Sequence, residues 1–120
     1  YFGDVHALQG DAECNGMGAI EIRGHLRLRV SLAPAPKKMT WPRIETPTHI
    51  CTIGCARPLD DALRISFEEM VYWMEEEFGL PGPEAYMLLG QIAEARCTQM
   101  VNPKYTYICK VAKKYLVSHT

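Results

Sequence analysis

The clearest regular pattern in the sequence is an alternation of apolar and polar residues between Ala19 and Leu32. A period of two over this length predicts one long β-strand with a buried face and a polar face. Gly24 stands where the alternation calls for a large apolar side chain, and it predicts a bend or bulge in the strand. The apolar positions are Ile20, Ile22, Leu26, Leu28, Val30 and Leu32.

A helical period replaces the alternation after Pro58. Apolar residues recur every three or four positions from Pro58 to Phe78, which predicts one long amphipathic helix. Asp60 and Asp61 suit the positive N-terminal end of this helix. Gly79 is placed to adopt the left-handed conformation that ends it.

Shorter segments complete the expected order of elements. Gly82 and Pro83 open a second helix that we expect to reach about Ala95, and the short link predicts an antiparallel pair of helices. Further strands are predicted at His49–Cys55, Cys97–Val101 and Tyr105–Val111. The proline-rich stretch from Pro34 to Thr48 is expected to be an irregular loop. The pattern predicts an α+β fold of several strands with an antiparallel pair of helices.

Length and composition predict a single domain over residues 1–120. The chain has 48% hydrophobic residues, 22% charged residues and a formal net charge of −1, which excludes intrinsic disorder. No apolar stretch approaches the roughly 20 residues that span a bilayer, and no secretory signal opens the sequence. We expect a cytoplasmic protein with no membrane partner. The five cysteines include no CxxC pair, so we expect reduced thiols.

The charges divide unevenly along the chain. Residues 21–43 hold six Lys/Arg against one Glu, whereas residues 60–94 hold nine acids against Arg64. This division is typical of a basic sheet face beside an acidic helix face. The basic run from Arg23 to Arg29 also resembles a phosphate-binding stripe, but no aromatic residues alternate with it to stack bases. We therefore do not expect nucleic acid as a partner.

The first 13 residues concentrate the groups that carry chemistry. Asp4, His6, Gln9, Asp11 and Glu13 lie within ten positions, with glycines between and around them. Imidazole and carboxylate groups are the usual ligands of a catalytic divalent ion such as zinc. Without a metal, one of the same acids can serve as a general base. Gly-Asp and Asn-Gly pairs are also common turn formers, so a purely structural role is the alternative.

Ordered blocks of residues extend along most of the chain. The first half contains Gly3-Asp4-Val5-His6-Ala7, Gln9-Gly10-Asp11, Glu13 and Ala19-Ile20-Glu21; the second contains Thr52-Ile53-Gly54, Leu59-Asp60-Asp61-Ala62, Glu76-Glu77-Phe78-Gly79-Leu80, Glu84-Ala85-Tyr86-Met87-Leu88 and Thr98-Gln99-Met100-Val101-Asn102-Pro103. In order and spacing these blocks resemble the acetamidase/formamidase family. The resemblance implies a mainly β, sandwich-like sheet core to which the helix pair is attached. It also implies hydrolysis of short linear amides, such as formamide and acetamide, to a carboxylate and ammonia by a homo-oligomer.

The resemblance also implies roles for individual residues. Asp4 and His6 would bind a divalent metal ion such as zinc, while Asp11 or Glu13 would act as the catalytic base. Gln9 would bind the substrate amide. Glu21 matches the acid that follows in the family's motif, and we assign it to the substrate as well.

Two departures from the family follow from the same comparison. Family members are longer, so this chain is expected to be the C-terminal portion, and the absent N-terminal half would contribute to the same active site. Ala12 replaces the usual glycine, which would be unfavourable if that position requires a positive φ. The alternative function is a non-catalytic oligomerisation or metal-binding module that retains the fold.

Overall fold

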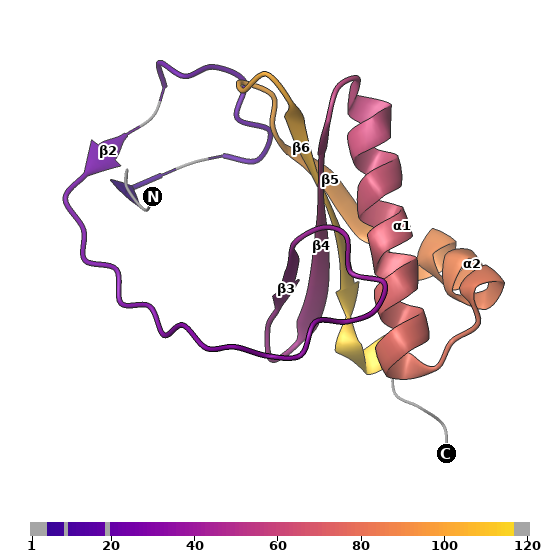
Figure 1. Cartoon of the computed structure of the whole chain (residues 1–120). Helices are drawn as coiled ribbons and strands as arrows, with labels where there is room; N and C mark the ends of the chain where they lie inside the picture. The colour runs from indigo at the N-terminus through magenta and orange to yellow at the C-terminus, as the bar shows by residue number, and fades with distance from the viewer. Residues whose placement is uncertain (1–4, 9, 19, 117–120) are drawn as a thin grey trace.

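The computed structural model describes residues 5–8, 10–18 and 20–116. Within these residues the chain forms an α+β fold with two helices and antiparallel strands, which confirms the predicted class (Figure 1). In chain order the elements are β1 (Val5–His6), β2 (Glu21–Ile22), β3 (Arg43–Glu45), β4 (His49–Ala56), α1 (Leu59–Phe78), α2 (Gly82–Ile92), β5 (Glu94–Gln99), β6 (Tyr105–Ala112) and a 3₁₀ turn at Lys113–Tyr115.

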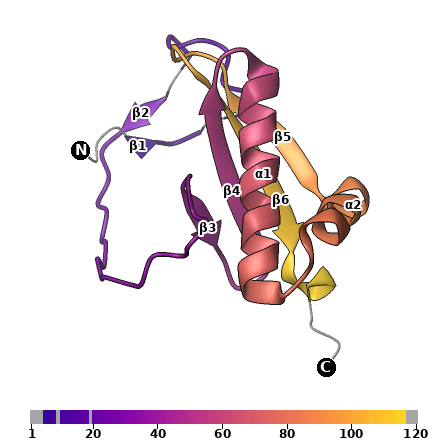
Figure 2. The same cartoon turned by 45° about the vertical axis from the view of Figure 1, so that its right-hand side comes forward.

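The main sheet has four antiparallel strands in the order β3-β4-β6-β5. Figure 2 shows α1 lying along one face of this sheet, with α2 beside it. Strands β1 and β2 form a separate two-stranded ribbon. None of the described helices is long and apolar enough to cross a membrane.

The hydrophobic core lies between the sheet and α1. Its fully buried members include Ile50 of β4, Val111 of β6 and Met70 and Met74 of α1. The closest approach is at Gly54 of β4, where an added Cβ would lie 2.1 Å from the carbonyl oxygen of Ala62. The backbones of strand and helix therefore touch, and only glycine fits there.

The predicted limits of α1 are confirmed. The helix begins at Leu59 and ends at Phe78, and Gly79 caps it with a φ of 66° in the left-handed region. The backbone N–H of Leu80 donates to the carbonyl oxygen of Met74 at 3.3 Å, closing the last turn.

The predictions for the other elements are confirmed only in part. The strands predicted at His49–Cys55 and Tyr105–Val111 are present as β4 and β6. Helix α2 ends at Ile92 rather than near Ala95, because Glu94 already pairs with Lys110 at the start of β5. The predicted loop before Thr48 contains a strand, β3, which pairs with β4.

The long strand predicted over Ala19–Leu32 is wrong for the described residues. Only Glu21–Ile22 belongs to a strand, and residues 23–33, called here the arm, form no strand and run outward from the sheet in a wide loop (Figure 1). Alternation specifies the two faces of a strand, but it does not provide a neighbour with which to pair. Gly24 does not replace a core residue: it admits the side chain of Val5, whose Cγ2 would lie 2.7 Å from an added Cβ.

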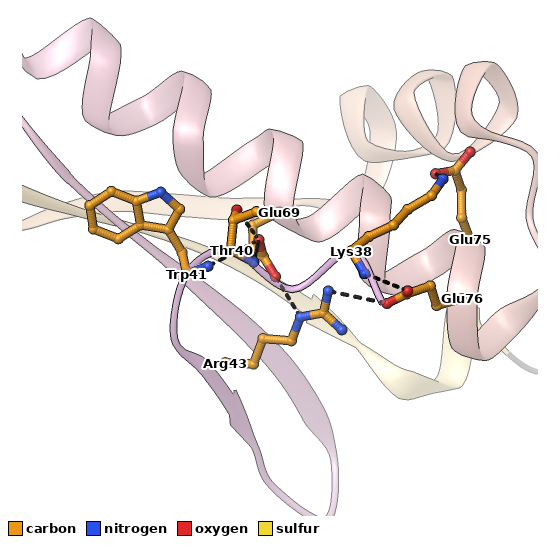
Figure 3. A network of polar contacts seen from close by, with 7 residues as sticks. All are labelled: Lys38, Thr40, Trp41, Arg43, Glu69, Glu75 and Glu76. Atoms are coloured by element: carbon orange, nitrogen blue, oxygen red, sulfur yellow. Dashed lines mark hydrogen bonds and ion pairs between the residues drawn. The ribbon is translucent and has the colours of Figure 1, made fainter. Parts of the chain in front are cut away.

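A buried polar network attaches the loop after the arm to α1 (Figure 3). Glu69 is 1% exposed, and its Oε1 accepts a hydrogen bond from Arg43 Nε at 2.6 Å. Its Oε2 accepts from the backbone N–H and the hydroxyl of Thr40 and from the backbone N–H of Trp41. The Arg43 guanidinium also lies over the ring of Trp73, with 5.2 Å between Cζ and the ring centroid. Paired and hydrogen-bonded in this way, the two opposite charges can remain inside the protein.

Partly buried glutamates of α1 extend the network toward the arm. Lys38 Nζ pairs with Glu75 at 2.7 Å, and the backbone N–H of Lys38 donates to Glu76. The basic segment thus packs against the acidic helix, which accounts for part of the charge division in the sequence.

Candidate active site

The acidic loop of residues 10–18 and the β1–β2 ribbon enclose a shallow hollow of about 270 Å³. Three predicted site residues, His6, Asp11 and Glu13, line it. Asp4 and Gln9 lie outside the described residues. The full lining is His6, Leu8, Gly10, Asp11, Ala12, Glu13, Cys14, Asn15, Gly18 and Ile20.

The β1–β2 ribbon brings His6 and Glu21 together. These residues are register partners in an antiparallel pair, so their side chains leave the same face of the ribbon. The sequence pattern placed each of them near the site but did not predict that they face each other. Glu21 does not line the hollow itself, but lies beside it through this pairing.

Asp11 points toward the main sheet. Its Oδ2 lies 2.5 Å from Nη1 of Arg96 on β5, and this carboxylate raises the pKa of the Arg96 guanidinium. Both side chains are about half exposed, so the pair contributes little to stability. Its effect is positional, because it joins the loop to a strand 85 residues away in the sequence.

The backbone of Glu13 makes a second connection to the same region. The Glu13 N–H donates to the Thr98 carbonyl at 3.2 Å, and the Met100 N–H donates to the Glu13 carbonyl at 2.8 Å. Between the two anchored acids, Ala12 has a φ of 57°. Position 12 therefore does require the left-handed conformation in which glycine is favoured over alanine.

Gln99 supports the strand end on which the loop rests. Its side-chain Nε2 donates to the Lys104 carbonyl at 2.7 Å, and its Oε1 accepts the backbone N–H groups of Val101 and Asn102. The side chain thus fixes the turn between β5 and β6, close to where Glu13 binds. The sequence predicted a strand at Cys97–Val101 and identified residues 98–103 as a family block, whereas β5 runs from Glu94 to Gln99. It did not predict the contact made by Arg96.

A metal requires more ligands than this part of the chain gathers. No group of three His, Cys, Asp or Glu side chains among the described residues is arranged to hold a metal ion. A catalytic zinc ion takes three protein ligands. The described residues alone therefore do not form a complete zinc site, and His6 would need ligands from elsewhere.

A larger hollow lies outside this region, between α1 and α2. It measures about 810 Å³ and is lined mainly by apolar residues such as Phe67, Val71 and Met87. Its one acid, Glu68, accepts a hydrogen bond from Tyr72. The smaller hollow is instead lined by His6 and two carboxylates that belong to the predicted site, and we assign the candidate site there.

Comparison with known proteins supports the family resemblance of the sequence blocks described above. The acetamidase/formamidase family model matches residues 1–111. The chain therefore belongs to the acetamidase/formamidase family. No curated protein sequence matches the chain significantly.

Solved structures show the same relationship. An acetamidase from Yersinia enterocolitica is 42% identical, with a TM-score of 0.65, over 68% of this chain and 24% of that chain. An acetamidase from Bacillus halodurans is 32% identical, with a TM-score of 0.57, over 62% of this chain and 25% of that chain. A predicted acetamidase/formamidase from Thermoanaerobacter tengcongensis, at 23% identity and a TM-score of 0.56 over 67% of this chain and 27% of that chain, shares the fold. The chain spans about a quarter of the length of these proteins.

Proposed function

We propose that this chain contributes part of an amidohydrolase active site that hydrolyses short linear amides, such as formamide and acetamide, to a carboxylate and ammonia. The observation that carries the proposal is the attachment of the acidic loop to β5 through Arg96 and through the Glu13 backbone. Two segments of the family resemblance that are far apart in the sequence, the one that contains Glu13 and residues 98–103, meet there. A small hollow lined by His6 and two carboxylates suits a small polar substrate.

Of the two candidate bases, we assign the catalytic role to Glu13 and an anchoring role to Asp11. The ion pair with Arg96 directs the Asp11 carboxylate at β5. Glu13 lines the same hollow while its backbone is fixed on both sides. Its carboxylate would accept a proton from the attacking water and return it to the departing ammonia.

Substrate and metal binding would involve the remaining predicted residues. Gln9 and Glu21 would hydrogen-bond the amide group of the substrate. Asp4 and His6 would hold a divalent ion, for which zinc suits the donor set, together with a ligand from outside the described residues. A bound ion would supply polarisation of the amide carbonyl and activation of water.

The assembly would complete the pocket. The chain spans about a quarter of its structural relatives, so we propose that the rest of a family-length polypeptide supplies the other walls, within a homo-oligomer. An alternative is a non-catalytic oligomerisation or metal-binding module that retains the fold.

Substitution of the two acids tests the assignment in an assembled protein, namely the Yersinia enterocolitica acetamidase with this chain in place of its matching quarter. We expect Glu13→Gln to lower kcat for acetamide by about 100-fold or more, in the range of lost general-base catalysis. Asp11→Asn should act mainly by loosening the loop, with a smaller loss. Glu84→Gln, an exposed change on α2, is the matched control. Activity of the Glu13 variant within a few-fold of the parent would rule out Glu13 as the base.

A further inference from the structure

The arm has the residue pattern of a β-strand and none of the contacts of one. Leu26, Leu28, Val30 and Leu32 alternate with polar residues and are between 50% and 102% exposed. No backbone hydrogen bond joins residues 23–33 to another element among the described residues. A row of exposed large apolar side chains along an unpaired extended segment is typical of a surface that another chain segment covers.

Both ends of the arm are fixed. At the start, Glu21–Ile22 pairs with β1 and Gly24 packs under Val5. At the end, Lys38 and the buried network around Glu69 attach the chain to α1 (Figure 3). The ends of the extended segment are therefore held in place while its middle remains uncovered.

The charge of the polar face disfavours pairing between two copies of the arm. Arg23, His25, Arg27 and Arg29 occupy the alternating polar positions. In an antiparallel pair of arms the arginines of the two copies would lie on the same face, and like charges across a ladder are destabilising. The preferred neighbour is a strand whose apolar residues alternate with acidic ones.

We propose that the arm is a strand that pairs with a strand from the part of the family-length polypeptide outside this chain. Two observations identify this occupant. The family model includes the arm within residues 1–111, and the chain spans only 24% of the Yersinia enterocolitica acetamidase. The proposal rests on family membership and on the exposed apolar side chains that alternate with polar ones along the arm. It does not depend on amide hydrolysis.

Amide hydrogen exchange tests the proposal in two proteins, the isolated chain and the chimera in which it replaces the matching quarter of the Yersinia enterocolitica acetamidase. We expect residues 26–32 to exchange at unstructured rates in the isolated chain. In the chimera, alternate amides of this segment should slow by 100-fold or more. Unchanged exchange in the chimera would overturn the proposal. Concentration-dependent protection in the isolated chain would overturn it in favour of a second copy.

Paired variants separate the two faces of the arm. In the chimera, Leu28→Ser with Val30→Ser should abolish the protection, whereas Arg27→Ser with Arg29→Ser should weaken it less. Equal losses would contradict an apolar face seated on a neighbouring strand. The readout is exchange rather than turnover, so an assembled but inactive chimera would refute the amidase proposal and leave this one standing.

Expression of the same two parts as separate polypeptides guards against a chimera that does not fold. This chain and the rest of the relative's chain should co-purify, with the arm amides protected in the complex. A complex with an unprotected arm, or the failure of both formats to assemble, would overturn the proposal.

Discussion

Ala12 lies in the left-handed region of backbone conformation, with a φ of 57°, between the two acids of the candidate site. An L-residue pays roughly 1–2 kcal/mol there, while glycine adopts the conformation without strain but loses more entropy on folding. The site loop is therefore held by Arg96 and β5 against a local backbone preference.

Ala12→Gly should raise the free energy of unfolding by about 0.5–1 kcal/mol, because the relief of strain exceeds the added entropy of the unfolded chain. Urea denaturation of the two proteins measures the difference. Ala95→Gly, in the extended backbone of β5, is the matched control and should lower stability. A loss of stability in both variants would contradict the strain argument.

The buried ion pair of Arg43 and Glu69 attaches the loop after the arm to α1. Glu69→Gln keeps the size of the side chain but leaves the Arg43 guanidinium, 6% exposed, without its buried counter-charge. We expect a loss of about 3–5 kcal/mol in unfolding free energy. Glu68→Gln, one position earlier and exposed, should change it by less than about 0.5 kcal/mol. Similar losses in both variants would show that the buried ion pair does not hold the loop.

At the scale of elements, the contact between β4 and α1 depends on Gly54. Gly54→Ala would place a Cβ 2.1 Å from the Ala62 carbonyl oxygen, so the helix must shift away from the sheet. We expect a loss of about 3 kcal/mol or more, at the upper end of overpacking effects. Gly90→Ala, where nothing lies within 4 Å of the added carbon, should gain about 0.5–1 kcal/mol. Thermal unfolding checks both, and a tolerated Gly54→Ala would contradict the close packing.

Elements with a strong period and partners in the same chain could be predicted from the sequence. The α1 pattern and its Gly79 terminator gave the helix within one residue, and β4 and β6 pair with each other. The predicted strand over Ala19–Leu32 failed because an alternating pattern does not supply a pairing partner, and no described segment pairs with residues 23–32. Strand β3 was hidden between Pro42 and Pro47, where proline suggested only a loop.

The candidate site was predicted in part. The density of acids around His6 identified the loop that lines the hollow. The contact between Asp11 and Arg96 could not be predicted, because an arginine in a strand carries no signal for a partner 85 residues away. The roles of ligand, base and substrate contact remain predictions.

At the scale of the whole molecule, buried thiols couple stability to pH. Burial raises the pKa of Cys109 to about 12, and the nearby Cys51 adds to the shift. The folded state therefore keeps a proton that the unfolded state releases above its usual value of 9.0. Stability is fully present below pH 9.0 and falls as the pH rises toward 12.

The expected fall is about 1.4 kcal/mol per pH unit from this one group. Urea denaturation under reducing conditions between pH 7 and about 10.5 measures it. Cys109→Ala should flatten the alkaline slope by that amount, whereas Cys14→Ala, an exposed thiol, should leave it unchanged. Parallel slopes for Cys109→Ala and the parent would contradict the linkage.

The central claim is that the acidic loop of residues 10–18 forms part of an amide-hydrolysing site that the rest of a family-length polypeptide completes. Its most direct test is ammonia release from formamide and acetamide by the isolated chain and by the Yersinia enterocolitica chimera, with metal content determined for each. We predict little or no release from the isolated chain and clear release from the chimera. A folded, assembled chimera that releases no ammonia from either amide would contradict the account and favour the non-catalytic module.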